Sequence, residues 1–323
     1  MKKLMVIPLV AAGMAAMVGC SKTPVKEAAK NDAINLANLD TAVAPGTDFY
    51  QYACGGWMKN NPLKPEYARF GTFDQLRDNN QEQIRTLIEG LSETPGQEGS
   101  VGQKIGMLFA MGMDSVKLNE DGYAPIKDQL AEINKLGTKD ELTKMVATLH
   151  KEGMAPFFAL YVGADEKNSS MNIVQLYQAG LGMGDRDYYL LEDESSQKMR
   201  EAYKNYITRL FTLIGSSPEQ ADAAVNAIMK IERGIAEVSF SREDLRDSQK
   251  NYNKMSIEDF KAKNDLLNWD VYFESMGMMD IKYLDAKQLS FYEGLSALMK
   301  NTTLDEQKYY LTFNLLSSAA PYL

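Results

Sequence analysis

The chain has 323 residues, of which 45% are hydrophobic and 24% are charged, and its formal net charge is −9. This balance is ordinary for a globular protein, and the length suits about two domains of typical size. Lysine and arginine alternate with aspartate and glutamate along the chain, so no basic stripe is available to neutralise phosphates. Nucleic acid is therefore excluded as a partner.

The N-terminus has the pattern of a bacterial lipoprotein signal. Lys2 and Lys3 precede an apolar run over residues 4–18, which is shorter than the ~20 residues of a transmembrane helix. Small residues then lead to Cys20, in a spacing that resembles a lipobox. We expect a signal peptide over residues 1–19 and a lipid on the Cys20 thiol. The alternative is an ordinary secretory signal that ends near a cysteine.

The residues after this signal predict a tether and an exported body. Residues 20–38 are polar and poor in aromatic side chains, which is typical of a flexible linker. No later run reaches membrane-spanning length, so we expect attachment to the membrane through lipid only, in the bacterial cell envelope on its periplasmic or surface face. Cys54 is then the sole thiol of the body, where a buried free cysteine acting as a small hydrophobe is one explanation.

The stretch over residues 45–78 concentrates seven aromatic side chains among glycines and prolines. Such rings must be buried, yet the segment is too interrupted to form one regular element. Its pattern predicts a short helix over residues 48–53, a turn at Gly55-Gly56, an extended crossing through Pro62 and Pro65, and a helix from about Thr72.

Helical periodicity dominates the middle of the chain. Apolar residues recur at helical spacing over residues 72–91, 104–117 and 122–136, with a loop over residues 92–102. Thr138 and Glu141 form a capping box for a further helix that Gly153 ends.

Two β-prone runs follow, over residues 157–162 and 171–177, and the polar link between them predicts a hairpin. Helices are expected over residues 195–214 and, from the Ser217-Pro218 start, to about residue 240; further helices begin at Ser256 and Thr303. The predicted fold is mainly α, a large multi-helix lobe with one small β-hairpin.

Two motifs then give the chain a family resemblance. The first motif is DFYQYACGGWMKNN with ARFGTFDQLRD, and the second, about 130 residues later, is QAGLGMGDRDYYL. Both are similar to sequence blocks of the neprilysin-like M13 zinc metallopeptidases. The resemblance covers residues 39–323, and the final segment resembles an internal stretch of the family. It implies an M13 peptidase N-terminal domain that is incomplete at its C-terminus, because the family's HExxH and downstream ExxxD motifs are absent.

The donor inventory limits the chemistry that this chain can perform. Hydrolytic zinc sites use three protein ligands, typically with histidine, and the sequence holds one histidine, His150. We expect no metal ligand, no cofactor and no catalytic residue in the chain, although the family uses Zn²⁺. His150 ends an amphipathic helix, where an imidazole near the last carbonyls is favourable. A thiol–imidazole pair of Cys54 with His150 has no local support.

Other candidates depend on the resemblance. In the family, the arginine just before the GxFDxLRD helix binds the C-terminal carboxylate of the peptide substrate, and the matching residue here is Arg69. Bidentate capture by a guanidinium makes this role reasonable; an ion pair with Glu66 or Asp74 is the alternative. The Cys in ACGGW pairs in many members with a cysteine of the C-terminal half, which is the second explanation for Cys54.

The glycines and the charged residues of the second motif allow two further predictions. Gly180, Gly182 and Gly184 follow a strand, but Asp185 stands where a phosphate would lie, so they are not a dinucleotide fingerprint. The carboxylates of Asp185 and Asp187 are expected to be solvated or bound to Arg186, or to form a buried structural network with it.

The resemblance implies the substrate-enclosing portion of an exported, lipid-anchored zinc metalloendopeptidase that acts on small peptides. Its expected partners are a peptide substrate and the missing catalytic half, and this chain is expected to be inactive alone. The alternatives are a non-catalytic helical lipoprotein that binds peptides or a partner protein, and a split enzyme whose HExxH lies on a second polypeptide.

Overall fold

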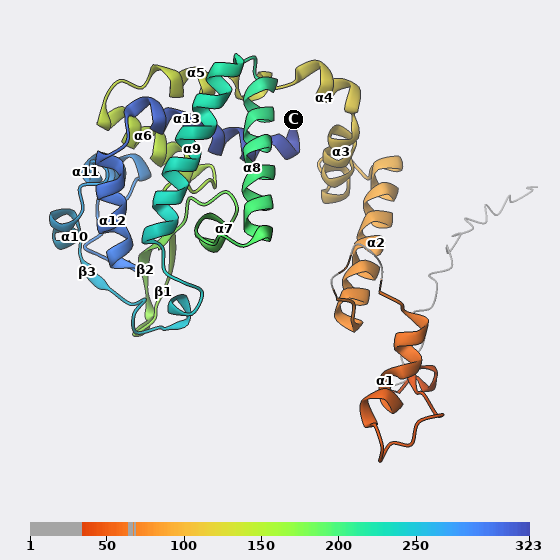
Figure 1. Cartoon of the computed structure of the whole chain (residues 1–323). Helices are drawn as coiled ribbons and strands as arrows, with labels where there is room; N and C mark the ends of the chain where they lie inside the picture. The colour runs from red at the N-terminus through yellow and green to blue at the C-terminus, as the bar shows by residue number, and fades with distance from the viewer. Residues whose placement is uncertain (1–33, 64–66, 68) are drawn as a thin grey trace, which may run out of the picture. The chain divides into compact units, whose positions relative to one another are not determined.

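A computed structural model describes residues 34–63, 67 and 69–323, so the Cys20 prediction and Glu66 lie outside the described residues. The described residues form two compact units, which lie within residues 1–106 and 107–323; both are drawn in Figure 1 and are described separately below. Among the described residues, no helix combines the length and apolar character that crossing a bilayer requires.

In the described part of the first unit there are three α-helices and a short 3-10 helix. The 3-10 helix η1 spans Leu36–Asn38, and the α-helices are α1 (Phe49–Asn60), α2 (Thr72–Glu93) and the beginning of α3 (Val101–Met113). Asp48 caps α1 by accepting a hydrogen bond from the Gln51 N–H at 2.9 Å.

The expected turn at Gly55-Gly56 is wrong, because α1 continues through both glycines. They serve close packing instead of chain reversal. A Cβ on Gly56 would lie 2.4 Å from the Ala37 carbonyl oxygen, and one on Gly55 would lie 2.7 Å from the Asp40 Cβ. Only glycine therefore allows the segment around η1 to lie directly against this helix.

Helix α2 is amphipathic, but much of its apolar face is exposed. Phe73, Leu76, Ile84 and Leu87 recur at helical spacing and are 87%, 57%, 46% and 63% exposed. We call these four residues the apolar stripe of α2. The end of α2 is covered, since a Cβ on Gly106 of α3 would lie 2.3 Å from the Leu91 carbonyl oxygen.

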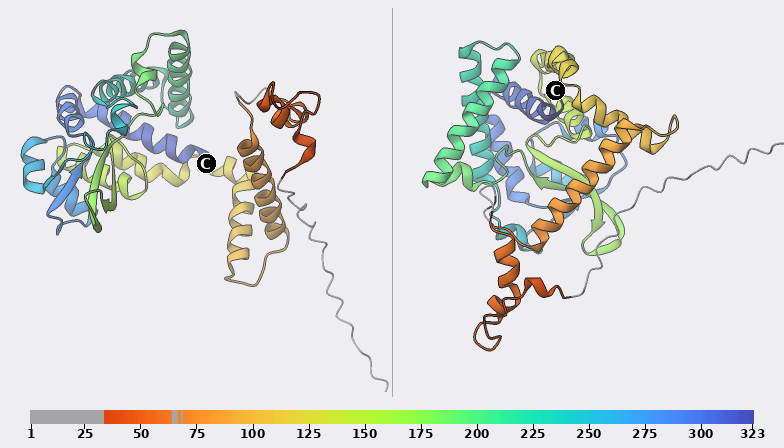
Figure 2. Two further views of the ribbon diagram at one scale, coloured as in Figure 1. Left: turned by 90° about the horizontal axis from the view of Figure 1, so that it is seen from below. Right: turned by 90° about the vertical axis from the view of Figure 1, so that its right-hand side faces the viewer.

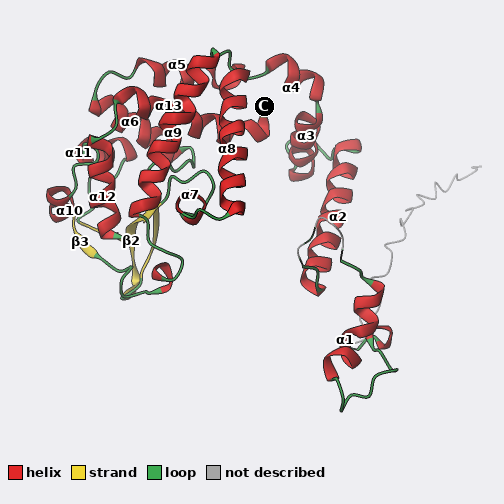
Figure 3. Ribbon diagram, viewed as in Figure 1, coloured by secondary structure: helices red, strands yellow, loops and turns green. Residues whose placement is uncertain are grey.

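The second unit is dominated by helices, as the colours of Figure 3 show. Helix α4 spans Ser115–Asp121, η2 Ala124–Ile126, α5 Lys127–Lys135, α6 Lys139–Lys151, α7 Asp187–Leu190, α8 Glu194–Leu213, α9 Pro218–Val238, η3 Asp244–Arg246, α10 Ile257–Lys263, α11 Trp269–Met276, α12 Leu289–Lys300, α13 Leu304–Ala319 and η4 Ala320–Tyr322. The capping box predicted at Thr138 is present, and Ser217 and Thr303, which were predicted to begin helices, also form capping boxes. Asp114 breaks the helix expected over residues 104–117 by capping α4.

The predicted hairpin is present, and two further strands extend it into a four-stranded sheet. Strand β1 (Phe158–Asp165) pairs antiparallel with β2 (Asn168–Gln178), with Val162 opposite Val174. Strand β4 (Tyr283–Ala286) pairs parallel with β2, and β3 (Lys254–Ser256) pairs antiparallel with β4. In Figures 1 and 2 the β1–β2 hairpin extends beyond the helices of the unit at one side.

A charged cluster ties the end of the hairpin to the later strands. The buried Asp165 carboxylate accepts hydrogen bonds from the Tyr252 hydroxyl at 2.9 Å and from the Lys254 ammonium at 2.7 Å. Beside it, Lys287 pairs with Glu166 and, at 3.2 Å, with Asp285. Partners 87, 89 and 121 residues away thus hold the tip of the hairpin against β3 and β4.

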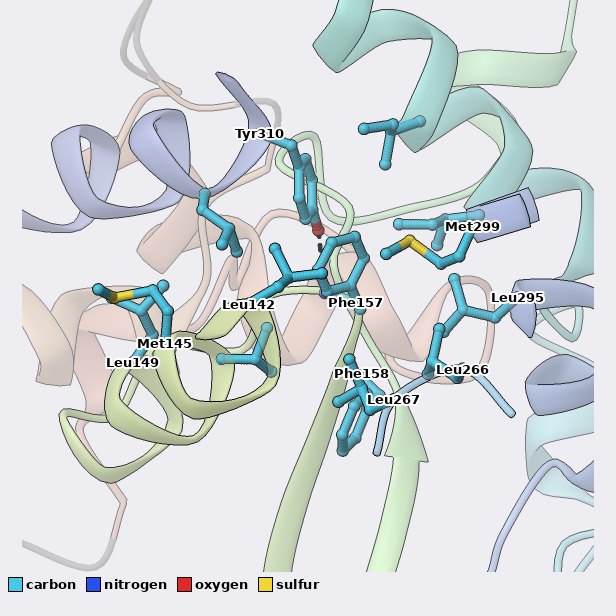
Figure 4. Close-up of a cluster of buried hydrophobic side chains, with 14 of the residues drawn as sticks. Leu142, Met145, Leu149, Phe157, Phe158, Leu266, Leu267, Leu295, Met299 and Tyr310 are labelled. Atoms are coloured by element: carbon cyan, nitrogen blue, oxygen red, sulfur yellow. Dashed lines mark hydrogen bonds between the residues drawn. The ribbon is translucent and has the colours of Figure 1, made fainter. Parts of the chain in front are cut away.

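The core of the second unit converges on two phenylalanines at the start of β1 (Figure 4). Phe157 and Phe158 are fully buried, and Phe158 packs edge-on against His150 and Tyr292. Phe157 has a φ of +68°, a left-handed conformation that is costly for an aromatic residue. Its N–H donates to the Tyr310 hydroxyl at 3.1 Å, which helps to hold this conformation.

Helices α9 and α12 cross at a pair of glycines. A Cβ on Gly234 would lie 2.4 Å from a Leu298 methyl carbon, and a Cβ on Gly294 would lie 2.4 Å from Val238 Cγ1. Each glycine thus receives a branched side chain of the facing helix. This close approach fixes the position of α9, which carries the central residue of the site described next.

Candidate functional site

A cleft of about 540 Å³ opens in the second unit beside the loop that follows β2. Residues 177–182 and Gly184, which include all of the GLGMG motif except Met183, form one wall. Phe313, Asn314 and Ser317 of α13 form another, and Glu232 of α9 lies at its buried end.

The motif glycines are required by what packs against them. Gly180 has a φ of +94°, and a Cβ there would lie 2.6 Å from the Tyr310 hydroxyl. A Cβ on Gly182 would lie 1.8 Å from the Tyr203 hydroxyl. These contacts give the motif glycines a packing role.

Glu232 is the centre of a buried hydrogen-bonded network. Its carboxylate accepts from the Tyr189 hydroxyl at 2.7 Å and from the Tyr203 hydroxyl at 3.0 Å, and the Gly182 backbone also bonds to it. Among the described residues it has no cationic partner, and the side chain is almost completely buried. Burial outweighs these hydrogen bonds and raises the pKa of Glu232 to about 7.

Tyrosine hydroxyls also hold the backbone of the loop at both ends. The Tyr189 hydroxyl accepts from the Met183 N–H at 3.0 Å while it donates to Glu232. The Tyr310 hydroxyl donates to the Gly180 carbonyl at 2.8 Å. The loop from Gly180 to Met183 is thus clamped from α7 and α13.

Sequence reasoning missed Glu232, although a signal was present. It lies beside Ile231 and one helical turn after Ile228, so it falls within the apolar face of a predicted helix. A glutamate at such a position needs buried partners. The tyrosines that supply them come from α7 and α8, and no sequence pattern connects those helices to residue 232.

The charged motif residues anchor the loop to the segment after α9. Arg186 donates to the Ser239 carbonyl, and Asp185 forms an ion pair with Arg242. A bond to Arg186 was one of the alternatives expected for Asp185, but its ion-pair partner is Arg242; Asp185 also accepts from the Asp187 N–H at 2.9 Å. The Asp185 carboxylate is 15% exposed and its Arg242 partner 63%, so the carboxylate is largely covered while its partner lies at the surface.

His150 is enclosed by the core and does not act as a charged helix cap. Its Nε2 lies 3.2 Å from the Pro156 carbonyl, which can only accept, so this nitrogen carries the proton. Its Nδ1 then accepts from the Tyr272 hydroxyl at 2.6 Å. Burial lowers the pKa of His150 to about 4, so the ring is neutral at pH 7. Both nitrogens are occupied, which leaves none to activate Cys54.

Arg69 lies between two anchored aromatic residues of the first unit. Phe70 stacks on Trp57 with ring centroids 6.0 Å apart, and the Tyr67 hydroxyl donates to Asp78 at 2.9 Å. Arg69 itself is exposed. Its predicted alternative partner Asp74 is engaged elsewhere, with Arg77 at 3.1 Å and with the Gly71 N–H at 2.9 Å.

The described residues do not fit a zinc site. They contain no group of three or more His, Cys, Asp and Glu side chains that could hold a metal ion. Cys54 is a free, half-buried cysteine on α1, and the histidine ring nitrogens are already engaged. No catalytic step through zinc can be derived from these residues.

A comparison with known protein families decides the classification. The model of peptidase family M13, for its N-terminal part, matches residues 45–323. The chain belongs to peptidase family M13. Its helical lobe with one small sheet is the fold of the N-terminal lobe in that family.

Curated relatives and solved structures agree with this membership. Endothelin-converting enzyme 1 of Mus musculus is 29% identical over 348 aligned positions, covering 100% of this chain and 44% of the relative; the Homo sapiens protein is 29% identical, covering 89% and 38%. The inhibitor complex of Mycobacterium tuberculosis zinc metalloprotease ZMP1 matches with a TM-score of 0.78 at 24% identity, covering 90% of this chain and 44% of that one. PEPO from Lactobacillus rhamnosis matches with a TM-score of 0.68 at 20% identity. This M13 chain thus spans less than half the length of its relatives.

Proposed function

We propose that this chain is the substrate-enclosing N-terminal portion of a zinc metalloendopeptidase that acts on small peptides. The observation that carries the proposal is the family match over residues 45–323, combined with relatives of more than twice the matched length. Those relatives include proteins named as a converting enzyme and as zinc metalloproteases. The zinc ligands and the general base are then supplied by polypeptide that the described residues do not contain.

Reconstitution tests this division of labour. The full chain is assayed with a fluorogenic small peptide and zinc, alone and mixed with a polypeptide that carries the HExxH and ExxxD motifs. We expect substoichiometric zinc and no cleavage from the chain alone, and chelator-sensitive cleavage from the mixture. Chelator-sensitive cleavage by the homogeneous chain would contradict the proposal. Peptide binding without cleavage in the mixture would favour the non-catalytic lipoprotein.

Within this function, Arg69 binds the C-terminal carboxylate of the peptide. Arg69 is exposed and has no ion pair with another described residue, and its neighbours Tyr67 and Phe70 pack against each other. Arg69→Met in the reconstituted enzyme should raise KM for a free-acid peptide about 10- to 100-fold, since it removes charge-assisted hydrogen bonds. KM for the amidated peptide should change little. Arg85→Met, at another exposed arginine, is the control; equal effects on both peptides would refute the role.

The same proposal places the protein in the bacterial cell envelope, anchored by lipid on Cys20. The signal over residues 1–19 and the polar tether over residues 20–38 support it. Cys20→Ala should move the chain from the membrane fraction to the soluble fraction. Mass spectrometry of the mature wild-type N-terminus without an acyl adduct would refute it.

A further inference from the structure

The buried carboxyl group of Glu232 is surrounded by hydroxyls, and the nearby cations are committed elsewhere. Tyr189, Tyr203 and Tyr310 are the titratable groups that α7, α8 and α13 bring to it. Arg186 donates to the Ser239 carbonyl, Arg200 of α8 to the Tyr188 and Leu191 carbonyls, and Arg233 of α9 to Glu237 and the Tyr189 carbonyl. Asp185 pairs with Arg242. A carboxylate buried without a cation is poised to take up a proton.

Proton uptake changes the hydrogen bonds that Glu232 makes. The ionised carboxylate can only accept hydrogen bonds. The Tyr189 hydroxyl donates to one of its oxygens and the Tyr203 hydroxyl donates to the other. The protonated group must itself donate. One tyrosine hydroxyl then has to turn its own proton to another acceptor.

This change reaches the cleft through Tyr189. The hydroxyl that donates to Glu232 also accepts the Met183 N–H, and Gly182 bonds directly to Glu232. We propose that protonation of Glu232 loosens the loop from Gly180 to Gly184, and that ionisation clamps it, so that the cleft beside the loop responds to pH. This proposal concerns the present chain alone and does not depend on the peptidase function.

The pH range in which Glu232 titrates is consistent with this proposal. Burial raises the pKa of Glu232 from 4.5 to about 7, so the group changes charge close to neutral pH. Because the folded state favours the neutral form, stability due to this group is fully present below about pH 4.5. It is lost as the pH rises toward about 7.

The experiment measures hydrogen exchange of the full chain between pH 5.5 and 8.5, corrected for intrinsic rates. The Met183 amide should exchange about fivefold faster at pH 5.5 than at pH 8.5, because protonation of Glu232 costs the loop about one hydrogen bond. The change should have a midpoint near 7, and the Glu232 carboxyl ¹³C signal should titrate with it. In Glu232→Gln the exchange should be independent of pH. Glu237→Gln, an exposed site on the same helix, should behave as wild type.

Two results would overturn the proposal. The first is corrected Met183 exchange that does not vary with pH in the wild type, or that varies equally in Glu232→Gln. The second is a Glu232 ¹³C signal that titrates below pH 5.5. The second measurement needs only the wild type, so it decides the question even if Glu232→Gln fails to fold.

Discussion

Several residues of this protein have their identity or backbone conformation constrained by contact with one neighbouring side chain. The hydroxyl of Tyr203 leaves no room for a side chain on Gly182, and the Tyr310 hydroxyl supports a left-handed Phe157. His150 is neutral because the core surrounds it. The motif and the lone histidine were both recognisable in the sequence, but their roles depend on partners 130 and 122 residues away.

Gly182→Ala should destabilise the second unit by about 3 kcal/mol, because a methyl group would overlap the Tyr203 hydroxyl and disturb Glu232. Urea denaturation followed by circular dichroism measures this. Gly112→Ala, a helical glycine with nothing within 4 Å of its Cβ position, is the matched control and should change stability by less than about 1 kcal/mol. Equal stability of the two variants would show that the loop yields to the methyl group.

His150 gives the protein an acid sensitivity of defined sign. Its folded pKa of about 4 lies below the unfolded value of 6.5, so its contribution is present above pH 6.5 and is lost as the pH falls toward 4. The loss should reach about 3 kcal/mol. Denaturation of wild type and His150→Gln at pH 7 and pH 4.5 isolates this term. The wild type should lose more stability than the variant, and parallel losses would contradict the assignment.

At the scale of elements, local signals predicted most helices, and long-range contacts decided the rest. The capping boxes at Thr138 and Ser217 begin helices as predicted, because the bonds they make are local. The strands β3 and β4 were missed because they are three and four residues long, and β4 pairs with a strand more than 100 residues earlier. The prediction of a turn at Gly55-Gly56 was wrong because these glycines pack against residues 37–40, and the sequence around the glycines does not indicate that contact.

The stability of the sheet should depend on pH through the ionisation of Asp165. Its bonds to Lys254 and to the Lys167 N–H lower its pKa to about 2, so its contribution is present above about pH 4 and is lost as the pH falls toward 2. Asp165→Asn should lower the Tm at pH 7 and converge with the wild type near pH 2. Asp270→Asn, whose exposed carboxylate pairs with Lys261, is the control and should leave the Tm nearly unchanged. A Tm difference for Asp165→Asn that is the same at both pH values would disprove this role.

At the scale of the whole molecule, the two units differ in how well they bury their apolar residues. The core of the second unit contains many fully buried aromatic side chains, whereas the apolar stripe of α2 in the first unit is exposed. Exposed stripes of this kind mark interaction or aggregation surfaces.

The chain should therefore bind an apolar dye such as anilinonaphthalene sulfonate and self-associate with rising concentration. The double variant Leu76→Gln and Leu87→Gln should reduce both effects with little change in stability, because both leucines are already more than half exposed. A matched pair, Leu191→Gln and Met279→Gln, changes exposed apolar residues outside the stripe. Equal dye binding by the two double variants would show that the stripe is not the surface responsible.

The sequence by itself determined the helical class, the helix starts and the family, because periodicity, capping residues and motifs act over short distances along the chain. Only the tertiary structure decided that the motif glycines pack against two tyrosines, that Asp185 binds Arg242, and that Glu232 is buried with no cationic partner among the described residues. These properties arise where residues distant in the chain exclude water from a common site. Burial sets the protonation of Glu232 and His150, and burial is a property of the assembled fold.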